Sequence, residues 1–108
     1  AVDPRVYSNG PIQSASQNGH ADIVKLLLAV EGERAVDPRA VGNFAIKSAS
    51  HNGHADVVKL LLAVEGERAV DPRAGGDFAI LWASENDHID TVDLLRDWYR
   101  KNGYMVPL

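Results

Sequence analysis

The chain of 108 residues carries a formal net charge of −4 and contains no cysteine. An acidic balance argues against nucleic acid as the main partner, because neutralising phosphates requires a concentrated basic face. The lack of cysteine excludes a disulfide scaffold and a thiolate zinc site. No apolar run approaches the roughly 18–20 residues that cross a bilayer, and no signal peptide is visible. We therefore expect one intracellular, cytoplasmic domain over residues 1–108, with neither a membrane nor nucleic acid as a partner.

The string Ala-Val-Asp-Pro-Arg recurs along the chain. It starts at Ala1, Ala35 and Ala69, which fixes a period of 34 residues. A fixed period in this range indicates a solenoid, in which each unit contacts only its neighbours. The repeat divides the chain into units 1–34, 35–68 and 69–102, followed by a tail over residues 103–108.

Units one and two are nearly copies of each other. They differ at eight positions, seven of which lie between the Asp-Pro turn and the Asn-Gly turn. Such near-identity indicates either a recent tandem duplication or a designed sequence. Change confined to one stretch is what partner selection produces, and it is also what drift at exposed sites produces.

Each unit opens with a turn that leads into a short helix. In unit two, Pro38 fixes φ and removes a backbone donor, which is typical of a turn. Gly42 predicts a hairpin tip with positive φ, as do the two glycines at the same place in unit three. Small and apolar residues then recur at helical spacing over residues 44–52, which predicts a helix of about nine residues. Gly53 is expected to end this helix in the left-handed conformation.

A second helix is predicted to start at His54 or Ala55. Asp56 lies near its N-terminus and complements the helix dipole. The apolar residues over 57–62 form a face that is too broad for a surface helix and suits a unit packed between two others. The glycine within residues 65–67 is expected to end the helix.

The two ends of the stack differ in polarity. Residues 96–101 of unit three are mostly charged, and the stretch is polar where unit two has Leu62 and Ala63. A polar outer face is what a terminal repeat needs. Unit three is therefore predicted to be a C-terminal cap, with residues 104–108 folding back over it. Unit one keeps its leucines at 26–28 uncapped. We expect this face to meet another molecule, as in a homodimer, or to have belonged to a longer array.

Three short strings carry a resemblance to a known family. Unit one contains Ala15-Ser16, Gly19-His20 and, over residues 24–28, Val-Lys-Leu-Leu-Leu, and unit two repeats all three. They match the Ala-Ala, Gly-His and Val-x-Leu-Leu-Leu pieces of the ankyrin repeat, so the chain resembles that family over practically its whole length. The resemblance implies an all-α repeat solenoid, an ankyrin-type stack of helix-turn-helix units joined by β-turn or hairpin loops.

The chain departs from the family pattern in two places. The family's Thr-Pro-Leu-His opening is replaced by the residues at 10–13, 44–47 and 78–81, and the period is 34 residues instead of 33. The tetratricopeptide repeat shares the 34-residue period and is the rival architecture. It requires longer helices with little between them, so the Pro- and Gly-bearing stretch between successive helix pairs favours the ankyrin pattern.

Three histidines, His20, His54 and His88, recur at the repeat period and could suggest a metal site. Neighbouring repeats stack at roughly 10 Å, whereas zinc–nitrogen bonds of about 2 Å require ligands that converge on one point. We therefore expect these histidines to cap helices or to hydrogen-bond between them. His51 lies close to His54 across a glycine turn, but the two do not form a helical pair, so no metal is expected.

The remaining polar residues do not form a catalytic constellation. Asp3, Asp37 and Asp71 precede prolines on an open surface that offers no burial to shift their pKa, so we interpret them as turn residues. The serines have no base at a suitable spacing, and no phosphate-binding Gly-Lys-Ser signature is present. Ser16 and Ser50 stand where the family has alanine and are expected to pack as small residues. We expect no enzyme and no cofactor.

The resemblance also implies where a partner binds, since family members bind proteins through the hairpin tips and the exposed side of the first helix, which line a concave groove. Carried over by position, the partner-binding residues are Arg5, Val6, Tyr7, Asn9, Gln13, Gln17, Arg39, Val41, Asn43, Lys47, His51, Asp77, Leu81 and Glu85. Trp82 aligns with a position where the family packs a leucine, so we expect it in the core and not at the centre of a binding site.

Two functions from different classes remain open at this point. The first is a non-enzymatic protein–protein interaction module that binds a protein of unknown identity through the groove. The alternative is a designed or excised scaffold with no natural ligand, which self-associates through its uncapped end.

Overall fold

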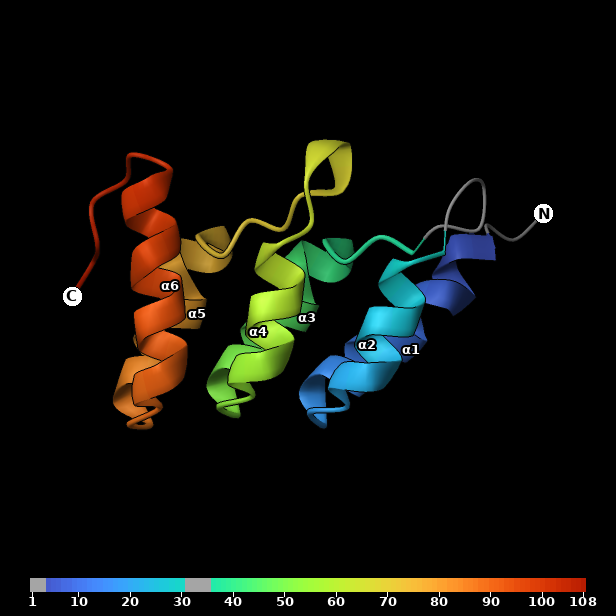
Figure 1. The fold of residues 1–108 in the computed structure, drawn as a ribbon, viewed down its shortest axis with the longest axis horizontal. Coiled ribbons are helices and arrows are strands. Elements are labelled where there is room, and N and C mark those ends of the chain that lie inside the picture. The colour runs from blue at the N-terminus through green and yellow to red at the C-terminus, as the bar shows by residue number, and fades with distance from the viewer. Residues whose placement is uncertain (1–3, 31–35) are drawn as a thin grey trace.

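The computed structural model describes residues 4–30 and 36–108, with side chains from residue 10 onward. In these ranges the chain forms three helix pairs that stand side by side along the long axis (Figure 1). The second helix of each pair lies in front of the first in this view. The helices are α1 (Pro4–Gln17), α2 (Ala21–Leu28), α3 (Ala40–His51), α4 (Ala55–Leu62), α5 (Ala74–Glu85) and α6 (Ile89–Lys101), with a 3-10 turn at η2 (Gly66–Arg68).

The first two pairs are joined by the Asn-Gly turn that the sequence predicts, and the third pair is joined by Asn86-Asp87. Gly53 has φ of 73°, and the next backbone N–H, that of His54, donates to Ala49 O at 2.9 Å. This bond and the left-handed residue form a Schellman ending, which closes α3 and allows the chain to reverse. The following helix starts at Ala55 as expected, but α4 ends at Leu62, before the glycine-bearing segment that was predicted to end it.

The tips that open units two and three differ in kind from the predicted hairpin. Val41, Gly42 and Asn43 have φ of 55°, 60° and 62°, so the positive φ at Gly42 is confirmed. Three consecutive residues in this region wind the backbone left-handed, and an extended strand cannot form there. No strand occurs anywhere in the described ranges. The right-handed part of α3 therefore begins at residue 44, as predicted.

The core lies between the repeats as well as within them. Ala45, Ile46 and Ala49 of α3 are fully buried, as is Ser50, and the small residues let neighbouring helices approach closely. Helix α3 contacts both α1 and α5, and α4 contacts both α2 and α6. These neighbour-only contacts produce an elongated body of 43 × 26 × 21 Å, as the solenoid prediction requires.

Aromatic side chains pack within the third repeat and against the C-terminal tail. Tyr99 of α6 is buried, and its hydroxyl donates to the carboxylate of Asp77 in α5. Burial and this hydrogen bond raise the pKa of Tyr99 above its ordinary value. Beyond α6 the chain turns back, and Tyr104 stacks on Trp98 with ring centroids 5.7 Å apart. The predicted fold-back is thus confirmed at Tyr104, whereas Met105 is 92% exposed.

Candidate functional site

The recurring histidines connect one repeat to the next. His54 Nε2 lies 3.0 Å from the carbonyl oxygen of Gln17, and His88 Nε2 lies 3.0 Å from that of His51. The imidazole stacks so closely on the preceding turn that a Cβ built on Gly53 would lie 2.5 Å from His88 Nδ1. The prediction of interhelical hydrogen bonding is confirmed for these two residues. Within the described ranges, no group of three metal-ligating side chains comes together.

Asp37 and Asp71 have structural roles in their opening turns, as predicted, and Asp3 lies outside the described residues. Asp37 Oδ1 accepts hydrogen bonds from the backbone N–H and the Nε of Arg39, both at 2.9 Å. Asp71 and Arg73 repeat this arrangement in the next unit. Each guanidinium group is hydrogen-bonded to the aspartate of its own turn. These hydrogen bonds raise the pKa of both arginines.

The predicted partner-binding residues fall into three groups. The side chains of Arg5, Val6, Tyr7 and Asn9 lie outside the described residues. A second group shares the outward side of the first helices, and we name it the first-helix surface: Gln13 and Gln17 on α1, Lys47 and His51 on α3, and Leu81 and Glu85 on α5. Gln17, Leu81 and Glu85 are exposed, and the other three are half-buried.

The third group belongs to the tips of α3 and α5 and to the turn before α3. Val41 is 75% exposed, and Arg39 forms the ion pair described above. Asn43 is half-buried, and its Oδ1 accepts a hydrogen bond from the Asp71 backbone N–H at 3.0 Å, which ties unit two to unit three. Asp77, at the equivalent place in unit three, accepts from Tyr99. The hydrogen-bonding oxygens of Asn43 and Asp77 therefore already have partners inside the stack.

The expectation of a core position for Trp82 is wrong. Its side chain is 39% exposed at the edge of the first-helix surface. The indole packs edge-on against His51, with centroids 5.0 Å apart, and tilted against Phe78 at 5.2 Å. Lys47 Nζ lies 5.7 Å from the centre of the Phe78 ring. Units one and two have serine at this position, and in unit three the indole lies against His51 of the neighbouring α3.

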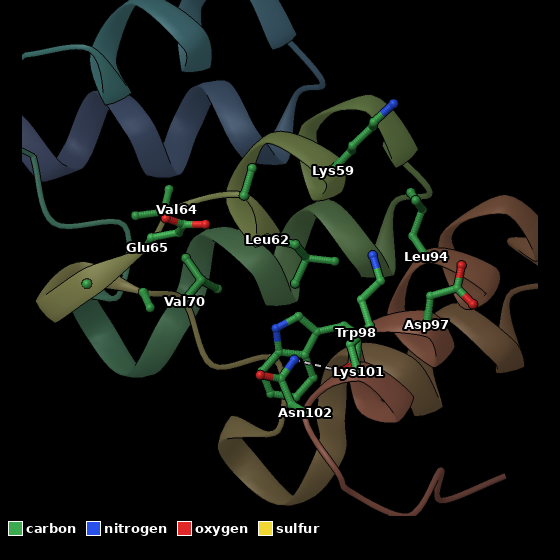
Figure 2. A pocket seen from close by; sticks show the side chains of 13 residues that line it. Lys59, Leu62, Val64, Glu65, Val70, Leu94, Asp97, Trp98, Lys101 and Asn102 are labelled. Carbon is green, nitrogen blue, oxygen red and sulfur yellow. Dashed lines mark hydrogen bonds between the residues drawn. The ribbon is translucent and has the colours of Figure 1, made fainter.

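A second concave feature lies between α4 and α6 (Figure 2). This outer groove has a volume of about 600 Å³, and its wall is formed by Leu62, Val70, Leu94 and Trp98 together with charged residues at the margin. The dashed line in Figure 2 marks Asn102 Nδ2 donating to Trp98 O at 2.8 Å. Sequence reasoning missed this groove, although the replacement of Val64 by a tryptophan at the same place in unit three was a visible signal.

The fold and the repeated contacts define a helical-repeat protein whose pairs stack through equivalent junctions. A family model described as ankyrin repeats (3 copies) matches residues 12–103. The chain belongs to the ankyrin-repeat family, and ankyrin repeats are generally protein–protein interaction modules without catalytic activity. Searches of the curated proteins and of the solved structures return no match. None of the helices described is both long and apolar enough to cross a membrane.

Proposed function

We propose that this chain is a non-enzymatic interaction module that binds a protein through the first-helix surface and the tips beside it. The exposed pair Leu81 and Trp82, on a helix whose other large apolar side chains are buried or half-buried, carries the proposal. Binding energy at interfaces concentrates in a few large side chains, among which tryptophan is enriched. We extend this surface to Arg5, Val6, Tyr7 and Asn9 of unit one and place the module in the cytoplasm.

The chemistry around Trp82 indicates what a partner presents. The indole and Leu81 offer an apolar centre, and Lys47 and His51 lie on one side of it while Glu85 lies one turn further along α5. An apolar side chain of the partner fills the centre, and polar groups match the mixed charges at the margin. A strongly basic or acidic partner is not favoured by this mixture.

The first-helix surface is favoured over the outer groove. In the outer groove the largest side chain, Trp98, is half-buried and is stacked against Tyr104 of the same chain. A partner would have to displace or avoid this stack. The exposed part of Trp82 is open to solvent beside the first-helix surface. A partner can therefore cover it with no rearrangement of the chain.

The test compares proteins captured by the immobilised chain with those captured by the variants Leu81→Ala and Trp82→Ala. Loss of a central contact of about 2 kcal/mol weakens binding by about 30-fold. Quantitative mass spectrometry is expected to show at least one protein whose recovery falls with both variants. Met105→Ala, at a side chain that is 92% exposed outside this surface, is the matched control. Equal recovery of every protein by all four chains contradicts the proposal.

A further inference from the structure

Lys47 is a cation that the other two units do not share. The same position is Gln13 in unit one and Leu81 in unit three. The lysine extends from α3 toward unit three, and its Nζ lies 5.7 Å from the centre of the Phe78 ring. Within the described residues Lys47 forms no ion pair. The first-helix surface therefore contains a half-buried ammonium group that no described carboxylate neutralises.

The tip of unit three leaves space for this ammonium group. A Cβ built on Gly75 would lie 2.8 Å from Lys47 Nζ, which is closer than a real Cβ approaches. Units one and two carry Tyr7 and Val41 at the place of Gly75. Val41 has φ of 55°, so positive φ alone does not require glycine at this place. A lysine found only in unit two thus meets a glycine found only in unit three.

The carboxylates of the neighbouring tip have other partners. Asp77 accepts a hydrogen bond from Tyr99, and Asp71 is paired with Arg73. An ammonium group that is half-buried over an aromatic ring has lost part of its hydration, so an ion pair is stronger there than in bulk water. Charge complementarity therefore favours an anionic group of the partner beside Lys47.

A row of rings links this ammonium group to the apolar centre of the surface. Phe78 lies next to Lys47, and Trp82 follows with ring centroids 5.2 Å apart. An extended chain advances about 3.3 Å per residue, so a segment that covers Trp82 reaches Lys47 within about two or three residues. Glu85 lies at the other end of α5 and repels a second carboxylate there.

We propose that the first-helix surface binds a protein segment in which one carboxylate lies about two or three residues from the apolar side chain that covers Trp82. This carboxylate pairs with Lys47 in the space beside Gly75. The inference rests on the proposed function and adds the chemistry of the partner to it. A single carboxylate is sufficient, so the partner need not be strongly acidic overall.

The experiment uses short synthetic peptides as probes. Each has a central leucine or tryptophan with one glutamate about two or three residues to either side, and each is paired with the same peptide carrying glutamine. Fluorescence anisotropy measures both affinities for the chain. We expect at least one glutamate peptide to bind roughly three- to tenfold more tightly than its glutamine form. The binding should weaken in Trp82→Ala, which locates the peptide on the first-helix surface.

Lys47→Gln tests the cation directly. This variant should bind the glutamate and glutamine forms of the selected peptide with nearly equal affinity. Lys59→Gln is the matched control, because it removes the same charge from an exposed lysine of α4, outside the first-helix surface. The control should retain the preference for glutamate.

Two glycine variants test the space beside the ammonium group. Gly75 and Gly76 have φ of 71° and 73°, but no atom lies within 4 Å of a Cβ built on Gly76. Alanine is therefore similarly strained at both positions, and only Gly75→Ala displaces the end of Lys47. We expect Gly75→Ala to reduce the preference for glutamate and Gly76→Ala to retain it.

Three results overturn the inference. They are equal affinity of the chain for the glutamate and glutamine forms, a preference that persists in Lys47→Gln, and a panel in which no peptide binds. Peptides that bind without a preference for glutamate, and that bind more weakly to Trp82→Ala, contradict this inference and leave the proposed function standing. Capture of proteins by Leu81→Ala is measured separately, so the two failures are distinguishable.

Discussion

Units two and three use one scaffold under different constraints. Asn43 of unit two accepts a hydrogen bond from the backbone of unit three, whereas Asp77 at the same place in unit three accepts from Tyr99 of its own repeat. Gly53 lies beneath the imidazole of His88, whereas Asp87 at the equivalent turn of unit three is exposed. The inner repeat therefore uses these two positions for contacts with its neighbour, whereas in unit three Asp77 bonds within its own repeat and Asp87 is exposed.

The largest expected effect concerns the glycine of the inner turn. Gly53→Ala places a methyl group against His88 and forces alanine to adopt φ of 73°. We expect a loss of about 2–4 kcal/mol in the free energy of unfolding, from backbone strain of roughly 1–3 kcal/mol plus displacement of the ring. Urea denaturation measures it.

Gly103→Ala is the matched control, because this glycine has φ of 76° but no atom near its Cβ position. The control should cost only about 1 kcal/mol. Equal losses at the two sites would mean that the imidazole does not restrict the turn.

The next effect concerns the closure of unit three. Tyr99→Phe removes a hydrogen bond to a carboxylate within a buried site, and we expect a loss of about 1.5–3 kcal/mol. The variant also changes the dependence of stability on pH. The folded state raises the pKa of Tyr99, so the unfolded chain, with a tyrosine pKa near 10, loses its proton first.

Stability of the original chain should therefore fall as the pH rises from about 10, and the slope should be shallower in Tyr99→Phe. Tyr104→Phe, which leaves Tyr99 in place, is the control and should keep the steeper slope. Chemical denaturation at a series of pH values tests both. Parallel slopes for the original chain and Tyr99→Phe would show that this hydroxyl does not contribute.

The smallest effect concerns the left-handed tips. Val41 is a β-branched residue at φ of 55°, where unit three has Gly75. Strain of roughly 1–3 kcal/mol is partly offset by the backbone entropy of glycine, so Val41→Gly should stabilise the chain by about 1 kcal/mol. Gly75→Val is the reverse exchange and should destabilise it. If both exchanges lower the urea midpoint, the valine is not strained and its exposed side chain stabilises the tip.

Sequence reasoning succeeded for most of the local structure of a unit, although it missed the left-handed tip and placed the end of α4 too late. Local chemistry predicts the Asn-Gly turn, the start of the right-handed part of α3 and the start of α4. The 34-residue period predicts the interhelical hydrogen bond of His54. Sequence reasoning failed where a contact depends on how units are placed. Trp82 was expected in the core because of its alignment, and its exposure results from the approach of α3 and α5. The hydrogen bond between Asp77 and Tyr99 joins residues of different helices and leaves no pattern in the sequence.

The paired aspartate and arginine of each opening turn have an electrostatic consequence. Arg39 and Arg73 look like a row of cations in the sequence, but each is hydrogen-bonded to the carboxylate two residues before it. Each turn is therefore a small dipole, and neighbouring turns lie about one Debye length apart at physiological salt. Adding repeats lengthens this edge without building up charge along it. A partner that binds along these turns is recognised by shape complementarity and local hydrogen bonds. Its association rate should therefore depend little on ionic strength.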